Sequence, residues 1–212
     1  MARTEPFEKH AQHYEEWFEE NRFAYESELR AVRMLLPESD SSLDGVEIGV
    51  GSGRFAAPLG IKRGVEPSAA MRALARRRGI EVVDGVAEAL PFPDACFDLA
   101  LMVTTICFVD NVETSLKEAY RVLRPGGSLI IGLIDKESPL GVVYQANKDK
   151  SVFYRPATFY SVGELIPLLE QAGFRGFRFA QTIFHFLSEI KEVEPVREGY
   201  GEGSFVVIKA VK

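Results

Sequence analysis

The stretch "VEIGVGSGRF", residues 46–55, decides the fold of this chain. A short apolar run, interrupted by Glu47, leads directly into Gly49, Gly51 and Gly53. Glycine permits positive φ values and removes the Cβ atoms that would keep a ligand away from the backbone. A turn from a strand into a helix also exposes unpaired N–H groups, which bind anionic groups. The stretch therefore predicts a ligand-binding turn at the end of a buried strand.

Short apolar runs and amphipathic segments alternate after this turn. The expected strands are "GVEIGV", "RGVEP", "EVVDG", "FDLALMV" and "SLIIGLID". The expected helices begin after Gly53, at about Ser68, and at Asp110, where Glu113 completes a capping box and Pro125 to Gly127 end the helix. The apolar run 99–103 suits a parallel strand covered on both faces. We therefore expect an α/β, doubly wound, mostly parallel seven-stranded sheet of the Rossmann-like kind.

The two ends of the chain complete this layout. Residues 6–36 predict two amphipathic helices ahead of the sheet. A helix from Ser161 to Gly173 precedes two strands, 174–186 and 204–211, which we expect to form an antiparallel pair at the sheet edge. We expect a single domain over 1–212, with a helical cap (1–37), a cofactor-binding core (44–135), and a substrate-side cap with the last strands (136–212).

Composition narrows the class of partner. The formal net charge is −6 over 212 residues, so no global positive field attracts nucleic acid or an anionic membrane surface. The sequence shows no signal peptide and no apolar stretch of roughly 20 residues, which predicts a soluble, cytoplasmic protein without a membrane segment. Cys96 and Cys107 do not form a CxxC pair, and no metal site is expected. The sequence leaves the oligomeric state open.

An acidic residue at the end of the second strand identifies the class of ligand. Glu66 follows Gly49 at close to the distance at which an acidic residue reaches ribose hydroxyls, which indicates an adenosine-type ligand. The dinucleotide fingerprint GxGxxG requires a third glycine where this chain has Arg54. A phosphate-binding P-loop would require a Gly-Lys-Ser/Thr ending, which the turn lacks.

Four motifs together resemble one family. "VEIGVGSGRF", "GVEPSAAM", "GVAEALPFPDACFDLALM" and "LKEAYRVLRPGGSLIIG" occur in the order and spacing of the class I S-adenosylmethionine-dependent methyltransferases, especially their small-molecule type 11 branch. The resemblance covers residues 46–135. It implies S-adenosylmethionine as the cofactor and transfer of its methyl group to a small-molecule acceptor by in-line displacement, which requires no dedicated catalytic residue.

The resemblance also implies residue roles. Contacts to the amino acid part of the cofactor are implied for Glu47, Gly49, Val50 and Gly51. The ribose is expected to bind Glu66, with Pro67, Ser68 and Met71 beside it. Ala87 and Glu88 are expected beside the adenine, and Thr104 near the methionine part. Where many relatives have an acidic adenine contact, this chain has Val86. Tyr14 is expected as a lid or cofactor contact, and His13 is a candidate general base.

Acceptor specificity is expected from the least family-like segments: the N-terminal helices, residues 136–160 and residues 188–204. The Asn/Asp-Pro-Pro-aromatic turn of nucleic acid amine methylases is absent, because the chain has "TTICFVD" after the fourth strand. Two alternatives remain open at this point. They are a nicotinamide-dependent oxidoreductase and a noncatalytic module that binds S-adenosylmethionine.

Overall fold

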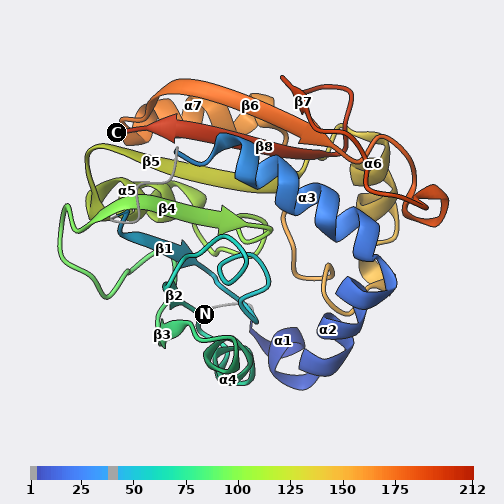
Figure 1. The fold of residues 1–212 in the computed structure, drawn as a ribbon, viewed down its shortest axis with the longest axis horizontal. Coiled ribbons are helices and arrows are strands. Elements are labelled where there is room, and N and C mark those ends of the chain that lie inside the picture. The colour runs from blue at the N-terminus through green and yellow to red at the C-terminus, as the bar shows by residue number, and fades with distance from the viewer. Residues whose placement is uncertain (1–3, 38–42) are drawn as a thin grey trace.

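The computed structural model describes residues 4–37 and 43–212, in which eight strands form one sheet of order β3-β2-β1-β4-β5-β8-β6-β7 (Figure 1). The strands are β1 (Gly45–Ile48), β2 (Arg63–Val65), β3 (Glu81–Val83), β4 (Phe97–Val103), β5 (Leu123–Ile134), β6 (Arg175–Thr182), β7 (Arg197–Glu198) and β8 (Phe205–Val211). β1 to β5 are parallel, and β8 lies antiparallel to both β5 and β6. This confirms the doubly wound sheet with its antiparallel edge.

The predicted strand number was one short. The additional strand, β7, has two residues and pairs with β6 at the sheet edge. A strand of this length carries no alternating pattern that a sequence could reveal.

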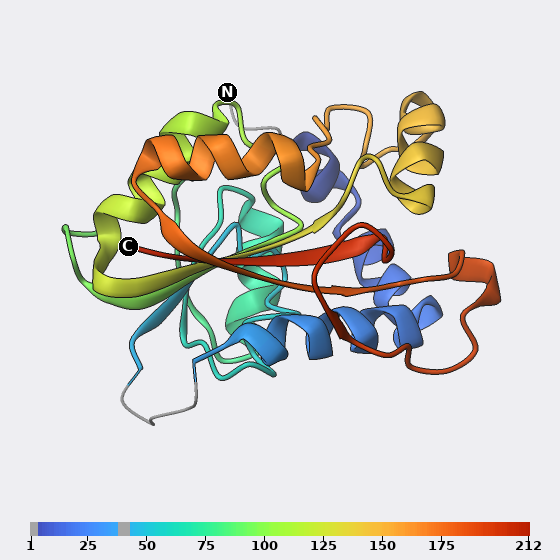
Figure 2. The same cartoon turned by 90° about the horizontal axis from the view of Figure 1, so that it is seen from above.

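Helices cover both faces of the sheet. Figure 2 shows α5 (Val112–Val122) and α7 (Val162–Ala172) on one face and α3 (Arg22–Leu35) on the opposite one. α4 (Ala69–Arg77) packs on the α3 side, because its Ala75 belongs to the same hydrophobic cluster as Val32 of α3. The remaining helices in the described residues are α1 (Glu5–Lys9), α2 (Ala11–Glu20), α6 (Pro139–Ala146) and the 3₁₀ turns η1 (Lys148–Lys150) and η2 (Leu187–Glu189).

The central strand β4 joins the two halves of the core. Ala100 and Met102 belong to the cluster beneath α5 and α7, whereas Leu99, Leu101 and Val103 belong to the cluster beneath α3. All five are at most 3% exposed. Successive side chains of a strand point to opposite faces, so an unbroken apolar run is required wherever both faces are covered.

Three local expectations were wrong. The N-terminal segment forms α1, α2 and α3 rather than two helices, because the backbone breaks at His10 and Asn21, neither of which is a proline or glycine. Residues 51–60 form consecutive turns rather than a helix. Within them, Gly51, Gly53 and Gly60 have positive φ values, which a right-handed helix does not contain.

The third wrong expectation concerns both ends of α5. Its N-cap is Asn111, whose side chain accepts from the Thr114 N–H at 2.8 Å, and not Asp110. The helix ends at Val122, because Leu123 is already extended and pairs with Phe97 of β4. Pro125 to Gly127 therefore lie within β5. The predicted helix from Ser161 to Gly173 is confirmed as α7, and Ser161 and Glu164 form a capping box at its start.

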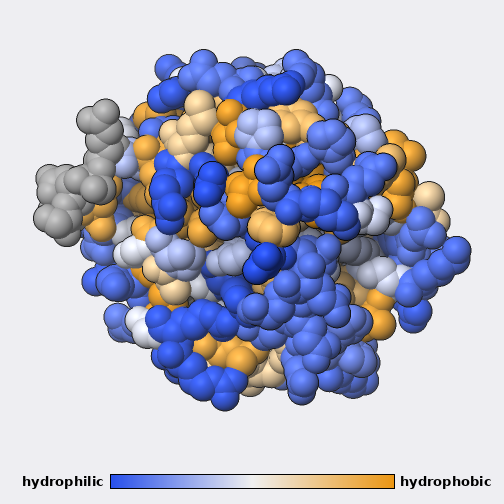
Figure 3. Space-filling view, turned by 45° about the vertical axis from the view of Figure 1, so that its right-hand side comes forward, coloured by the Kyte–Doolittle hydropathy of each residue, from blue (hydrophilic) through white to orange (hydrophobic). Residues whose placement is uncertain are grey.

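The described helices and the surface can be compared with the features of membrane and metal-binding proteins. None of their helices is both long and apolar enough to cross a bilayer. On the face seen in Figure 3, hydrophobic residues appear as patches between hydrophilic ones. No group of His, Cys, Asp and Glu within residues 4–37 and 43–212 is arranged to bind a metal ion.

Candidate active site

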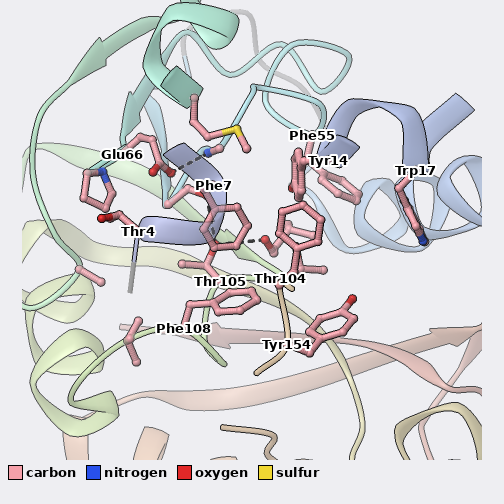
Figure 4. A pocket seen from close by; sticks show the side chains of 18 of the residues that line it. Thr4, Phe7, Tyr14, Trp17, Phe55, Glu66, Thr104, Thr105, Phe108 and Tyr154 are labelled. Atoms are coloured by element: carbon pink, nitrogen blue, oxygen red, sulfur yellow. Dashed lines mark hydrogen bonds between the residues drawn. The ribbon is translucent and has the colours of Figure 1, made fainter. Parts of the chain in front are cut away.

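A cavity of about 420 Å³ lies beyond the carboxyl ends of the parallel strands. Its floor includes the glycine turn and the residues that follow β2, β3 and β4. Its cover comes from α1 and α2 and from residues 150–154. Figure 4 shows Phe7 and Tyr14 directed into the cavity, between Glu66 on one side and Trp17 and Tyr154 on the other. Segments far apart in the sequence therefore enclose one site, at the edge where α/β sheets bind ligands.

The glycines of the turn are required for different reasons. A Cβ atom on Gly49 would lie 2.3 Å from a side-chain carbon of Thr105, so this glycine permits close packing of the chain. A Cβ atom on Gly53 would lie 3.3 Å from the Ala75 backbone of α4. A Cβ atom on Gly51 would meet only the Tyr14 hydroxyl, at 3.6 Å, and Gly51 lines the cavity. Gly51 is thus the glycine that leaves space for a ligand.

Glu66 organises the turn from the end of β2. Its carboxylate accepts the Gly51 N–H at 3.0 Å and the Ser68 N–H at 2.8 Å. The side chain lines the cavity although the residue is only 7% exposed. Burial raises its pKa to about 7, and the hydrogen bonds from Ser68 and Gly51 partly oppose this shift. Glu66 therefore has capacity to bind a ligand while holding the loop.

Glu47 lies behind the cavity and is not among its lining residues. It is 2% exposed, and its Oε2 has no hydrogen-bond partner among the described residues. Burial raises its pKa to about 8; a backbone hydrogen bond from Ala56 opposes the shift, and the charge of Glu66 adds to it. Its charge also raises the pKa of Tyr14, after the larger effect of burial. A buried oxygen without a hydrogen-bond partner is unfavourable, so Oε2 favours a hydrogen-bond donor such as a cationic group.

The other residues expected at the site fall into two groups. The cavity is lined by Tyr14, Gly49, Gly51, Pro67, Met71, Val86, Ala87, Glu88 and Thr104. Val50 and Ser68 do not line it. Val50 packs against Gly64, and the Ser68 hydroxyl caps α4 by accepting from the Met71 N–H at 3.2 Å.

Glu88 lines the cavity and also hydrogen-bonds to the backbone at the start of α5. Its Oε1 accepts the Asp110 N–H at 2.7 Å and the Asn111 N–H at 3.0 Å, which are the groups at the start of α5. No helix begins at Glu88 itself, since residues 86–89 form a turn closed by a bridge between Val86 and Ala89. The Glu88 carboxylate therefore binds the backbone at the N-terminus of α5.

Aromatic rings form most of the cover. Phe7 meets Tyr14 and Phe108 edge to face, at ring-centroid distances of 5.8 and 5.0 Å. Phe153 lies 5.6 Å from Phe7 and 5.5 Å from His13. Edge-to-face pairs of this kind add to the energy of burial. The N-terminal helices and residues 150–154 thus pack on each other above the site.

Polar contacts attach the N-terminal helices to the cofactor-binding core. The Glu8 carboxylate accepts from the backbone N–H groups of Ala69 and Ala70 at the start of α4. Glu15 of α2 pairs with Arg54 at 2.9 Å and with Arg78. Arg54, which replaces the third glycine of a dinucleotide fingerprint, therefore connects the glycine turn to α2.

Several cavity-lining residues were not predicted individually: Thr4, Glu28, Thr105, Phe108, Tyr144, Phe153 and Tyr154. Glu28 had a recognisable signal, because it lies in helical register with the buried Ala24, Ala31 and Leu35 of α3. Tyr144, Phe153 and Tyr154 fall within residues 136–160, which were expected to contribute to acceptor specificity. The pairing of Phe153 with Phe7 and Tyr14 had no local signal, because these segments lie more than one hundred residues apart.

Residues 188–204, expected to shape the acceptor pocket, do not line the cavity. They contact α3 instead. The Glu194 N–H donates to the Ser27 hydroxyl at 2.8 Å, and the Glu194 carboxylate accepts the Phe184 N–H at 2.6 Å. This loop therefore braces the helix that carries Glu28.

Comparisons with known proteins identify the family. The type 11 methyltransferase domain family matches residues 46–131. A crystal structure from Thermotoga maritima, of an S-adenosylmethionine-dependent methyltransferase, is 57% identical, with a TM-score of 0.95 and 99% of each chain covered. Uncharacterised proteins are 45% identical in Methanocaldococcus jannaschii (97% of this chain, 98% of that protein) and 34% identical in Mycobacterium tuberculosis (93% and 70%). The chain therefore belongs to the S-adenosylmethionine-dependent methyltransferases, and its residues 46–131 match the type 11 methyltransferase domain model.

Proposed function

We propose that this methyltransferase acts on a small-molecule acceptor bound beside the cofactor in the described cavity. The supporting observation is the cover. α1, α2 and residues 150–154 enclose a space of about 420 Å³, within the range that holds drug-sized ligands. A polymer such as nucleic acid would need an open path for its chain.

The residues at the glycine turn are suited to the cofactor. Glu47, with its unpartnered Oε2, would pair with the ammonium group, and the backbone around Gly51 would face the carboxylate. Glu66 would accept from the ribose hydroxyls. Pro67 and Met71 would flank the sugar, and Ala87 and Glu88 would lie beside the adenine. These placements extend the roles that the sequence motifs imply.

Methyl transfer depends mainly on how the acceptor is positioned and does not require a dedicated catalytic side chain. When bound, S-adenosylmethionine supplies a methyl group on a sulfonium, which is a good leaving group. The chain would orient the acceptor against that methyl and exclude water beneath the Phe7, Tyr14 and Phe153 rings. His13 lines the cavity and remains the candidate for accepting a proton.

The half of the cavity lined by Glu28, Ile134, Tyr144 and residues 150–154 would hold the acceptor; we call it the acceptor half. The Thermotoga maritima relative is described as a possible histamine N-methyltransferase. That description makes amines the first compounds to test.

A methyl-transfer screen tests the proposal. The protein is incubated with S-adenosylmethionine labelled in its methyl group and with pools of small metabolites, and label is followed into products. We expect transfer to a compound small enough for the cavity. Transfer to RNA, DNA or protein, with none to small molecules, would contradict the proposal.

A further inference from the structure

Glu28 is a buried acid in the acceptor half, and no contact neutralises it. Although it lines the cavity, the residue is only 4% exposed. Within residues 4–37 and 43–212, no hydrogen bond or ion pair contributes to the pKa shift of its carboxyl group. Burial alone raises its pKa to about 8. Burial disfavours the ionised form while no cation is present, and a cationic ligand that hydrogen-bonds to the group would stabilise that form.

Two tyrosine hydroxyls on the cavity wall lie within electrostatic reach of this carboxyl group. Tyr144 and Tyr154 stack at a centroid distance of 4.8 Å. Burial raises the pKa of both hydroxyls, and the charge of Glu28 raises them further, so both hydroxyls are neutral near pH 7. Glu28 also acts on Tyr14 and Tyr25 in the same way. Neutral rings next to a lone carboxylate attract a cation through both the ring faces and the charge.

No basic side chain on the described cavity wall takes that role. The basic residues lining the cavity are Lys150 and His13. The Lys150 amine donates to Asn147 at 3.4 Å, and the His13 ring packs against Phe153. A cationic ligand would stabilise the ionised form of Glu28, which burial alone disfavours, whereas an anionic or neutral ligand would not.

We propose that Glu28 binds a positively charged nitrogen of the methyl acceptor, and that the acceptor is an amine with a compact aromatic or apolar body. The proposal rests on the proposed function only in naming this ligand as the acceptor. The ammonium group hydrogen-bonds to the Glu28 carboxylate, while the faces of Tyr144 and Tyr154 hold the charge and the apolar body. Glu28 is thus a residue that determines substrate specificity.

A binding experiment tests this without requiring turnover. Trp17 is the single tryptophan of the chain and lines the cavity, so its fluorescence reports ligand binding. The protein is saturated with S-adenosylhomocysteine and titrated with histamine and 2-phenylethylamine, each beside its neutral alcohol analogue. We expect each amine to bind at least tenfold more tightly than its alcohol. Equal affinities within both pairs, or no binding by either amine, would overturn the proposal.

Variants assign the preference to one residue. Glu28→Gln keeps the shape and removes the charge, so it should abolish the preference for amines and leave S-adenosylhomocysteine affinity unchanged. Glu26→Gln is the matched control, because Glu26 lies on the same helix but is exposed and paired with Arg30. Glu28→Asp, which keeps a charge on a shorter stem, should retain part of the preference and replaces Glu28→Gln if that variant does not fold.

The outcomes separate this proposal from the proposed function. Loss of S-adenosylhomocysteine affinity in Glu28→Gln, with amine preference intact, would assign Glu28 to the cofactor and refute the acceptor role. Glu28-dependent amine binding in a protein that methylates no small molecule would support the cation site and refute the proposed function instead.

Discussion

Glu66 combines two tasks in one side chain. Its two oxygens hold Gly51 and Ser68, so the same carboxylate fixes the glycine turn and faces the cavity. A carboxylate has about four lone-pair positions, and these two contacts leave acceptor capacity for a ligand hydroxyl. A neutral amide in its place retains one accepting oxygen and brings an unwanted donor.

Glu66→Gln should weaken binding of S-adenosylhomocysteine by about 1–3 kcal/mol, because hydrogen bonds to a charged group are lost. Isothermal titration calorimetry measures the change. Asp84→Asn is the control, since Asp84 follows the neighbouring strand β3 and its side chain is 72% exposed. Unchanged affinity in Glu66→Gln would remove Glu66 from the proposed ribose contact.

At the scale of the element, the glycine turn offers an internal control. Gly51 (φ +52°) and Gly60 (φ +79°) both adopt the left-handed region, where a side chain costs roughly 1–2 kcal/mol. Gly51 lines the cavity, whereas a Cβ atom on Gly60 would meet nothing within 4 Å. The two positions therefore separate backbone strain from obstruction of the ligand.

Gly51→Ala and Gly60→Ala should both lower the melting temperature, because both impose the same kind of backbone strain. Only Gly51→Ala should also lower S-adenosylmethionine affinity, by at least about tenfold, or 1.4 kcal/mol. Calorimetry and thermal melts on both variants measure the two effects. Equal affinity losses in the two variants would show that strain, and not lost space at Gly51, weakens binding.

Elements with strong local patterns were predictable, and contacts between distant segments were not. The apolar run of β4 and the helix start at Ser161 and Glu164 depend only on residues close together in the sequence. The cap of α5 was placed one residue early, because Asp110 and Asn111 are both good caps and only packing chooses between them. The cover depends on Phe153 meeting Phe7, and no local pattern encodes such a pairing.

At the scale of the whole molecule, buried acids should make stability depend on pH. The folded-state pKa is about 8 for Glu28 and Glu47 and about 7 for Glu66, each raised first by burial from a usual value of 4.5. Between these values the folded chain retains protons that the unfolded chain releases. The free energy of unfolding therefore falls as pH rises from about 5 to 8, by at most about 1.4 kcal/mol per pH unit for each group.

Urea unfolding of the ligand-free protein at several pH values across this range measures the slope. Glu47→Gln should give a shallower fall than the wild type, because one of the retained protons is gone. Tyr14, whose pKa is raised by burial and by these carboxylates, stays neutral throughout and does not contribute. Stability that rises or stays level with pH would contradict this account.

The contact between Glu194 and Ser27 joins the loop between β6 and β8 to the residue beside Glu28. Mutations in that loop act on α3 through the hydrogen bond to the Ser27 hydroxyl, without contacting the ligand. Sequence changes in this loop could therefore shift Glu28 and alter acceptor selectivity while every cavity-lining residue stays the same. Paralogues with identical pockets can then differ in selectivity.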